Sequence, residues 1–273
     1  MEVVDFKSLG IDPNLCKGLS QIGYTLPTPI QIKACHASHT NFIAQSKNGT
    51  GKTLAFLIVA IGIVQTTHRK ALIITPTREI ALQIKSVYQS ISSYLEPQIK
   101  LLCAVGGFSI HKDIEGIDKY NPSIIVGTLG RLRALIEAKH IDGSQIGCTI
   151  LDEADILIRE NGFKRDVHAI LKSINIKTGQ FMAFSATVTA ELDKVFLAKQ
   201  IDYVRISEDE HSESWDSMFL KDVVQYYIIV KDCDSYSQKL DKLLNILEKC
   251  VYHQVIVFYN TKSLGLSLEK DLL

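Results

Sequence analysis

The sequence predicts an α/β fold, in which a parallel β-sheet is covered by helices on both faces. From about residue 40 onward, short β-rich runs alternate with helical patterns, which is the order typical of such a sheet. The strand candidates are apolar at nearly every position, as expected for strands that are buried on both faces. Polar motifs follow the strand candidates, and the ligands of such folds bind at the carboxyl ends of the strands.

Residues 41–46 (NFIAQS) form the first predicted strand, and a glycine-rich loop leads from it into an apolar helix that begins near Lys52. The second strand covers residues 71–76 (ALIITP). The helix after it carries an apolar face made of Ile80, Ile84, Val87, Tyr88, Ile91 and Leu95. Four more strands, each followed by a helix candidate, are predicted at residues 101–105, 123–128, 148–152 and 181–187.

The alternation divides the chain into two predicted domains. Residues 1–205 form the first, and residues 206–222 (ISEDEHSESWDSMFLKD) are interpreted as an acidic, serine-rich linker, with an acidic docking segment as the alternative. Two strands, 223–230 (VVQYYIIV) and 254–260 (QVIVFYN), then flank a helix with a leucine stripe. About fifty residues with two strands are too few to close a sheet, so residues 223–273 are expected to be the start of a second domain.

Composition excludes several classes of protein. Hydrophobic residues make up 46% and charged residues 22% of the 273, so the chain can bury a core and is not disordered. The 30 Lys and Arg balance the 30 Asp and Glu, so any basic surface must be local. The six cysteines form no CxxC pair and indicate free thiols rather than a zinc site or a disulfide framework.

The chain carries no signal for secretion or for a membrane. The N-terminus (MEVVDFKSLG) lacks a basic segment followed by an apolar one. Residues 53–68 are the longest run without Asp, Glu, Lys or Arg, and this run is shorter than the ~18 apolar residues of a membrane span. We expect a soluble protein of the cytoplasm, the nucleus or both, with no membrane partner.

The stretch QSKNGTGKT predicts a phosphate-binding loop between the first strand and the apolar helix. Phosphates bind where backbone N–H groups converge at a helix N-terminus, with a lysine for the outer phosphates and a hydroxyl for the metal. The predicted contacts are Gly49, Thr50, Gly51, Lys52 and Thr53, of which Thr53 also binds Mg²⁺. Ser46 stands where the strict GxxxxGK[ST] pattern has glycine, and we expect the loop to tolerate this small residue.

An acidic pair after the strand at 148–152 completes the predicted nucleotide site. In CTILDEAD, Asp152 would bind Mg²⁺ directly or through water, and Glu153 would polarise the attacking water. With Lys52 these two residues form the predicted catalytic set. The alternative is a helix N-terminus that is merely enriched in carboxylates.

Together, QSKNGTGKT, PTREIALQ, LDEADIL and FSAT resemble the motifs of the DEAD-box ATP-dependent RNA helicases. Upstream, Phe6 and residues 23–31 (GYTLPTPIQ) are similar to the adenine-reading Q motif of that family. The resemblance implies that Gln31 hydrogen-bonds adenine, that Tyr24 lies against the base, and that ATP and Mg²⁺ are the cofactors. It also implies a RecA-like first domain, followed by the truncated start of a second RecA-like domain.

The same resemblance implies an RNA site and a coupling element. RNA would lie across Pro76, Thr77, Arg78, Glu79, Gly106, Gly107, Thr128, Gly130 and Arg131. The two arginines can pair with phosphates and the glycines allow close approach, so binding should be sequence-tolerant. Ser185 and Thr187 would couple hydrolysis to RNA separation through Asp155.

Two departures from the family pattern stand out. Leu129 replaces the proline of the family's TPGR motif, for which we expect only a small loss of loop rigidity. The arginine motif of the family's second domain does not occur before the chain stops, so low hydrolysis by this chain alone is expected. A truncated, non-catalytic binding module is therefore the alternative to an active enzyme.

A narrower resemblance concerns the subgroup. QSKNGTGKT, LIEAKHIDGSQIGCTILDEAD and QYYIIV are similar to the DEAD-box subunit of the survival-of-motor-neuron (Gemin) complex. This similarity implies a role in ribonucleoprotein assembly, with proteins of the assembly complex as partners. Another DEAD-box branch with the same spacings is the alternative.

Overall fold

A computed structural model describes residues 4–159, 161–174, 179–207, 224, 226–229 and 235–272. The chain divides into two compact units, Met1–Phe219 and Leu220–Leu273. All strands assigned among the described residues belong to the first unit. The first unit includes the predicted first domain, residues 1–205.

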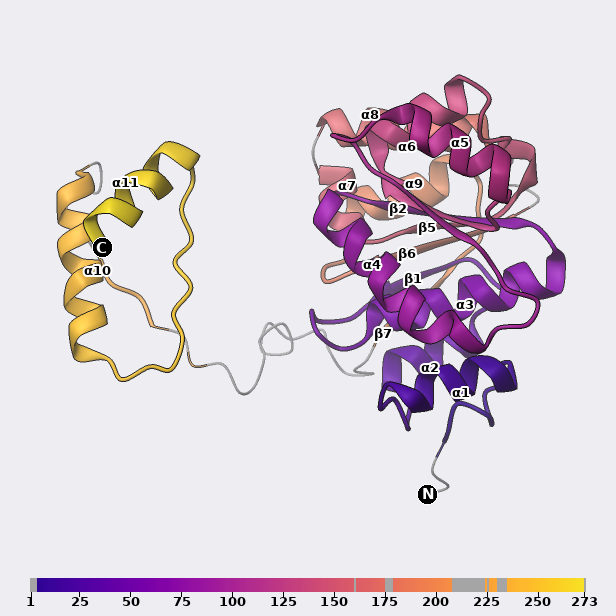
Figure 1. Cartoon of the computed structure of the whole chain (residues 1–273), viewed down its shortest axis with the longest axis horizontal. Helices are drawn as coiled ribbons and strands as arrows, with labels where there is room; N and C mark the ends of the chain where they lie inside the picture. Colours follow the sequence, from indigo (N-terminus) through magenta and orange to yellow (C-terminus); the bar gives the residue numbers. More distant parts are fainter. Residues whose placement is uncertain are drawn as a thin grey trace. The chain divides into compact units, whose positions relative to one another are not determined.

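The first unit is built on a seven-stranded sheet with the order β3-β4-β2-β5-β6-β1-β7 (Figure 1). Every described pairing in it is parallel, as predicted. The strands are β1 (Phe42–Gln45), β2 (Lys70–Thr75), β3 (Leu101–Ala104), β4 (Ile124–Thr128), β5 (Ile146–Leu151), β6 (Gln180–Ser185) and β7 (Val204–Ser207).

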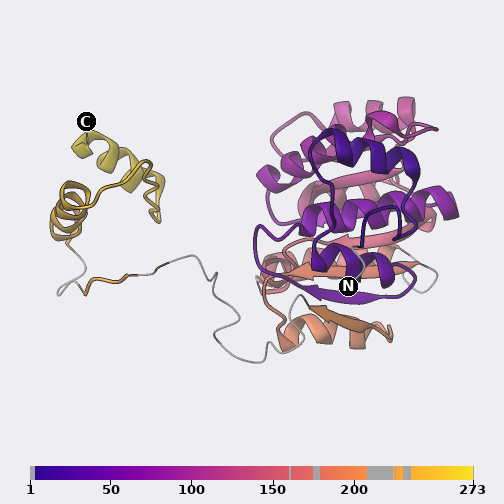
Figure 2. The same ribbon diagram turned by 90° about the horizontal axis from the view of Figure 1, so that it is seen from below.

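Helices cover both faces of this sheet (Figure 1). One face carries α1 (Pro13–Gln21), α2 (Pro29–His36), α3 (Lys52–Thr67) and α4 (Arg78–Ile91). The other carries α5 (Ile110–Tyr120), α6 (Leu129–Glu137), α7 (Ala154–Arg159), α8 (Asn161–Ser173) and α9 (Ala190–Ala198). Short 3₁₀ turns occur at Ser92–Tyr94 and Gly143–Gln145. Figure 2, viewed from below, places the N-terminal helices in front of the strands.

The core consists of two hydrophobic clusters, one on each face of the sheet. Successive strand residues point to opposite faces, so a continuously apolar strand supplies both clusters. In β1, Phe42 and Ala44 belong to the cluster under α1–α4, whereas Ile43 belongs to the cluster under α5–α9. This arrangement explains why the strand candidates are apolar at nearly every position.

Helix α3 is apolar on all sides because it is enclosed by other elements. Eleven of its 16 residues are buried, and it packs against α2 and the sheet. It begins directly after Gly51, whose φ of 100° is accessible to glycine at little cost. No helix in the described part of the chain is long and apolar enough to cross a bilayer.

The apolar face predicted for the second helix is present in α4. Ile84, Tyr88 and Ile91 are buried, and Ile80 and Val87 are partly buried. Leu95 is also buried but lies beyond the helix, because the chain changes to a 3₁₀ turn at Ser92.

Strand β7 was not predicted from the sequence. It pairs with β1 as an edge strand, so Ile206 and Ser207 belong to the sheet and not to the predicted linker. Val204 is 46% exposed, and a half-exposed run of four residues lacks the continuous apolar pattern of the inner strands. Residues 208–222 of the predicted linker lie outside the described residues.

The second unit contains α10 (Tyr236–Lys249) and α11 (Lys262–Leu272). The leucine stripe of α10, as predicted, is its least exposed face, and comprises Leu240, Leu243, Leu244 and Leu247. The two predicted strands are wrong for the described residues, since 224, 226–229 and 254–260 have no strand structure. A strand needs a neighbour for its hydrogen bonds, and Tyr226 and Phe258 remain 91% exposed.

Candidate functional site

The predicted motifs meet at one edge of the sheet. Residues 46–51, 76–79, 105–107, 128–131, 152–155 and 185–187 stand at or after the ends of β1, β2, β3, β4, β5 and β6. Because all the pairings are parallel, the carboxyl ends of these strands share an edge. The expectation that the motifs lie at that edge is confirmed.

The phosphate-binding loop is closed around its own lysine. Lys52 is 8% exposed, and its Nζ donates to the backbone oxygens of Ser46 (2.6 Å) and Lys47 (2.9 Å) and to Asn48 Oδ1 (3.1 Å). These acceptors hold the ammonium at the centre of the loop, where the N-terminus of α3 also begins. An anion placed there would meet both the lysine and the helix N-terminus.

Ser46 is accommodated by hydrogen bonds rather than by an unusual backbone. Its amide donates to Ser185 O (3.1 Å), and its hydroxyl pairs with that of Thr50, which in turn donates to Lys47 O (2.8 Å). The positive φ values of the loop fall on Gly49 (83°) and Gly51 (100°). The serine at the glycine position therefore causes no backbone strain.

Gln31 and Gly51 form a tightly packed contact beside the loop. Gln31 is 2% exposed; its Nε2 donates to Gly51 O (3.2 Å), and its Oε1 accepts from Thr28 N (2.9 Å). A Cβ at position 51 would lie 2.4 Å from Gln31 Nε2, so only glycine allows this approach. The buried Thr28 Oγ1 has no hydrogen-bond partner among the described groups, so a polar group of a ligand would fit beside it.

The two predicted aromatic contacts of the base differ in exposure. Tyr24 is 45% exposed and available to a ligand. Phe6 is 4% exposed and belongs to the hydrophobic cluster that also contains Leu15 and Ile30. Direct contact between Phe6 and adenine stays a prediction.

In the acidic pair, Asp152 is buried and Glu153 is half-buried, and the pKa of each carboxyl is raised. Asp152 is 5% exposed, and burial together with the charge of Glu153 raises its pKa to about 7. Burial and the charge of Asp155 raise the pKa of Glu153, and Lys52 opposes both shifts. Lys52 is therefore near both carboxylates, whereas their joint role at a nucleotide stays a prediction.

The donor set fits Mg²⁺. Carboxylate and hydroxyl oxygens are its preferred ligands, and here Asp152 and Thr53 would supply them. The described residues contain no group of three or more His, Cys, Asp or Glu side chains able to hold a metal by themselves. Mg²⁺ usually keeps several waters and binds substrate phosphates, so an incomplete set of protein ligands is what an ATP–Mg²⁺ site needs.

Glu153 occupies a strained turn between β5 and α7. Its φ is 49°, a left-handed conformation that is unfavourable for residues other than glycine. The turn is held by the amide of Asp152, which donates to Ile74 O (2.9 Å), and by Asp152 Oδ1, which accepts from the amide of Glu153 (3.0 Å). Such strain is typical of functional sites.

The coupling residues contact one another as expected. Thr187 Oγ1 donates to Asp155 Oδ2 (2.7 Å), and Ser185 Oγ donates to Thr187 O (2.7 Å). Through Ser185 O, which accepts from Ser46 N, the same segment touches the phosphate-binding loop. The contacts exist, whereas the coupling role stays a prediction.

The predicted RNA residues surround a cavity of about 600 Å³. It is lined by Pro76, Thr77, Arg78, Glu79, Gly106, Thr128, Gly130, Arg131 and Ala134. Gly107, the remaining predicted residue, adjoins it, because a Cβ there would lie 2.2 Å from Arg78 Nη1. Ala134, one helical turn after Gly130, was not predicted.

Sequence reasoning missed one charged residue of this region, Asp113. Arg131 donates from Nη1 to Asp113 Oδ2 (2.6 Å) and from Nη2 to Phe108 O. In the sequence, Asp113 appears only as an acidic residue in the first turn of a helix, which is common. Leu129 begins α6 and is buried, so the helix forms there without the family's proline.

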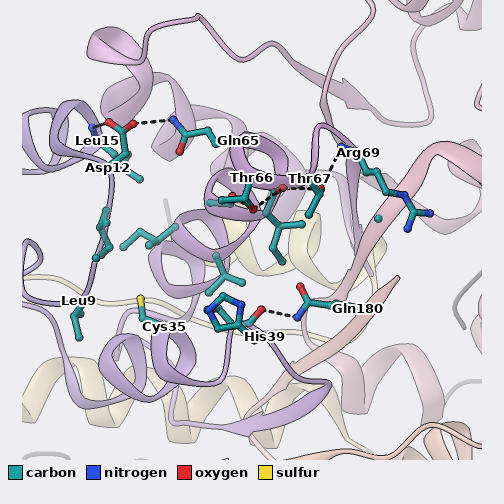
Figure 3. A pocket seen from close by; sticks show the side chains of 18 of the residues that line it. Leu9, Asp12, Leu15, Cys35, His39, Gln65, Thr66, Thr67, Arg69 and Gln180 are labelled. Atoms are coloured by element: carbon teal, nitrogen blue, oxygen red, sulfur yellow. Dashed lines mark hydrogen bonds between the residues drawn. The ribbon is translucent and has the colours of Figure 1, made fainter. Parts of the chain in front are cut away.

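A larger cavity, about 900 Å³, lies at the opposite edge of the sheet (Figure 3). It is enclosed by α1, α2, the second half of α3 and the starts of β5 and β6. Several of its polar groups are engaged with one another: Asp12 Oδ2 accepts from Gln65 (3.0 Å), and Gln180 donates to Ser38 O (2.5 Å). It contains no motif residue and does not mark the site.

The glycine-rich loop between β1 and α3, the enclosed lysine, and the carboxylates after β5 define a phosphate-loop nucleotide-binding domain. The profile of the DEAD/DEAH box helicase family matches residues 28–195. This chain belongs to the DEAD/DEAH box helicase family.

Relatives and solved structures agree with this placement. The chain is 33% identical over 265 residues to the ATP-dependent RNA helicase eIF4A of Lodderomyces elongisporus, covering 96% of this chain and 64% of that protein. It is 31% identical over 263 residues to the ATP-dependent RNA helicase FAL1 of Gibberella zeae, covering 94% and 62%. The chain thus spans somewhat less than two thirds of the length of these relatives.

Two solved structures show the same fold. A DEAD box protein from Methanococcus jannaschii has a TM-score of 0.68 at 29% identity, over all of this chain and 70% of that one. Dbp5 of S. cerevisiae, solved with RNA and ADP BeF3, has a TM-score of 0.80 at 26% identity, over 98% and 66%. The RecA-like fold that the resemblance implied is therefore present.

Proposed function

We propose that this chain is the ATP- and RNA-binding core of an ATP-dependent RNA helicase. The observation that carries the proposal is that the predicted nucleotide and RNA residues lie at one edge of one sheet. Lys52 is close enough to Asp152 to lower its pKa against the effect of burial, and the 600 Å³ cavity lies at the same edge. Hydrolysis by the whole enzyme and its RNA remodelling are part of this proposal.

Different residues of this chain would bind the phosphates, hold Mg²⁺ and activate the attacking water. Lys52 would leave its backbone acceptors and pair with the outer phosphates, and the first amides of α3 would face the same oxygens. Thr53 and Asp152 would hold Mg²⁺, which neutralises phosphate charge when it is bound. Glu153, whose pKa is raised, would accept a proton from the attacking water.

Gln31→Ala is expected to remove the preference for adenine nucleotides. The buried Gln31 amide carries a donor and an acceptor, and such bidentate reading of a base is worth about 1–3 kcal/mol. The preference of the wild type for ATP over GTP, about fivefold or more by that estimate, should fall to near equality. Competition binding with a fluorescent nucleotide measures the ATP and GTP affinities of the wild type and the variant, and Gln83→Ala, at an exposed residue, is the control. Equal binding of all nucleoside triphosphates by the wild type would contradict the assignment.

RNA would contact this chain mainly through its backbone. Arg78 and Arg131 line the cavity and suit phosphate oxygens, whereas base edges need hydrogen-bonding groups that the glycines lack. Affinity should therefore vary little with sequence and should fall as salt concentration rises. Binding of labelled single-stranded RNAs of different sequence tests this directly.

Gly107→Ala is expected to weaken RNA binding about tenfold, as for the loss of one charge-assisted hydrogen bond, and to leave nucleotide binding unchanged. The added Cβ would lie 2.2 Å from Arg78 Nη1, and the φ of 87° disfavours alanine. Gly62→Ala is the control, because Gly62 lies on α3 outside this cavity and a Cβ there meets nothing within 4 Å. Equal RNA affinities of the two variants would show that Arg78 is not displaced or not used.

We further propose that the RNA belongs to a ribonucleoprotein under assembly in the cytoplasm, the nucleus or both. The support is the similarity of QSKNGTGKT, LIEAKHIDGSQIGCTILDEAD and QYYIIV to the DEAD-box subunit of the survival-of-motor-neuron complex. In a non-catalytic module, partner proteins would still be retained in pull-downs after Lys52→Ala and Glu153→Gln. RNA-stimulated ATP turnover by the 273-residue chain would exclude that module and favour the enzyme.

A further inference from the structure

Arg131 is held by two acceptors from a neighbouring segment. It lies in the first turn of α6, and its Nη1 and Nη2 donate to Asp113 Oδ2 and to Phe108 O, respectively. Asp113 lies in the first turn of α5, and Phe108 lies in the loop that precedes that helix. The two contacts connect the Gly106–Gly107 side of the cavity to its Thr128–Arg131 side.

The Arg131–Asp113 pair is much more enclosed than a typical surface ion pair. The two side chains are 9% and 11% exposed. Arg133, on the same helix as Arg131, pairs with Asp166 of α8, and those side chains are 43% and 27% exposed. Exposed pairs contribute little because the side chains must be ordered and water screens them. In the enclosed pair the guanidinium is already immobilised before any ligand arrives.

A guanidinium has five N–H donors, of which these two contacts use two. Arg131 also lines the cavity that contains Arg78 and Gly130. A planar group held in one orientation loses less entropy when it binds a phosphate than a freely rotating one. The enclosure therefore prepares Arg131 for an anionic ligand.

We propose that Asp113 is a positioning residue for RNA, which holds the Arg131 guanidinium so that its remaining donors face one backbone phosphate. The proposal rests on the proposed RNA-binding function of this cavity. Asp113 itself would not touch the RNA, because its carboxylate repels phosphate and it is not among the residues that line the cavity. Burial raises the pKa of Asp113 and Arg131 opposes that shift, as expected for a carboxylate enclosed with its partner.

Two other roles of Asp113 lead to different results. As a mere partner of the α5 dipole, it would affect stability but would not be linked to Arg131 in RNA binding. As a mask of the arginine's charge, it would weaken RNA binding, and its removal would strengthen it. Only a positioning role predicts that removing Asp113 weakens RNA binding as much as removing Arg131 does.

The test is a double-mutant cycle on the full 273-residue chain, read by fluorescence anisotropy of a labelled single-stranded RNA over a series of salt concentrations. Asp113→Ala and Arg131→Ala should each weaken binding about tenfold, as for one lost charge-assisted hydrogen bond. Each should make the slope of log affinity against log salt shallower by about 0.7. The double variant should bind no more weakly than Arg131→Ala, and Asp113→Asn, which keeps an acceptor, should be intermediate.

Asp166→Ala is the matched control, because it removes the carboxylate that pairs with Arg133 outside the cavity. It should change RNA affinity less than about twofold, as is usual for an exposed pair. Thermal unfolding and binding of a fluorescent ATP analogue identify variants that lose RNA binding through misfolding. If Asp113→Ala misfolds, Asp113→Asn still tests the proposal, since its side-chain amide oxygen can accept a hydrogen bond from Arg131.

The outcomes separate this inference from the function on which it rests. No salt-dependent RNA binding by the wild type would overturn both. Wild-type RNA binding with unchanged or increased affinity in Asp113→Ala would overturn the positioning role alone. Additive effects of Asp113→Ala and Arg131→Ala would do the same.

Discussion

Lys52→Ala is expected to weaken ATP–Mg²⁺ binding about a hundredfold or more. The ammonium is enclosed by the loop at the N-terminus of α3, where it would form two or three charge-assisted hydrogen bonds with phosphate oxygens. Each such bond contributes about 1.5–3 kcal/mol, and about 2.8 kcal/mol corresponds to a hundredfold change in affinity. Titration with a fluorescent ATP analogue in the presence of Mg²⁺ measures the loss.

Lys119→Ala controls for the removal of a positive charge, because Lys119 is exposed on α5. It should bind the nucleotide as the wild type does. A thermal unfolding curve shows whether Lys52→Ala remains folded after the loop loses its central donor. If folded Lys52→Ala binds ATP–Mg²⁺ as tightly as the wild type, the assignment of the phosphate-binding loop is wrong.

Asp152→Asn is expected to stabilise the ligand-free protein at pH 8, raising its unfolding midpoint by about 3 °C or more, equivalent to about 1 kcal/mol. The wild-type carboxylate is 5% exposed, lies near Glu153 and Asp155, and has a pKa of about 7 in place of 3.8. Asparagine removes that charge and can still accept from the amide of Glu153 through Oδ1. A buried charge without a bound cation destabilises the fold, so its removal should help.

The pH dependence of this effect has a defined sign. Above pH 3.8 the unfolded chain releases the Asp152 proton, whereas the folded chain keeps it until about pH 7. The folded state therefore binds more protons, and its stability relative to Asp152→Asn falls between about pH 4 and pH 7. The difference between variant and wild type should be small at pH 4, should grow up to pH 7, and should be constant above.

Calorimetric unfolding at pH 5 and pH 8 without nucleotide tests this prediction, with the exposed Asp118→Asn as a control that should shift neither midpoint. Adding ATP–Mg²⁺ should reverse the order, because the wild type gains binding energy that the variant lacks. A lower midpoint for Asp152→Asn at pH 8, or a difference that is the same at both pH values, would show that the carboxylate is not under strain.

The sequence predicted the first unit well because its signals are local. A buried parallel strand is apolar throughout, and the loop QSKNGTGKT carries glycines where the backbone needs positive φ. Strand β7 could not be recognised in this way, because a half-exposed edge strand has no continuous apolar run. Residues 254–260 do have an apolar run and are nevertheless not a strand, since strand structure requires a paired neighbour as well as a suitable composition.

In the candidate site, too, some residues were predictable from local sequence signals and others were not. Gln31, Lys52, Asp152, Arg78 and Thr187 were predictable because each belongs to a short motif with its own spacing. Asp113 was not, because its partner Arg131 is 18 residues away on another helix and a single acidic residue in a first turn carries no signal. The burial of Phe6 in the core was equally hidden, since an isolated aromatic residue predicts neither exposure nor contact.

Up to β6, the alternation of strands and helices and the chemistry at the strand ends can be read from the sequence alone, because both depend on neighbouring residues. The tertiary structure sets the spatial order β3-β4-β2-β5-β6-β1-β7, which places the loop after β1 two strands away from the carboxylates after β5. It also decided the burial that raises the pKa of Asp152 and the enclosure of Arg131 by Asp113. Burial and ion pairing depend on which distant segments exclude water from a side chain, and no local pattern encodes that.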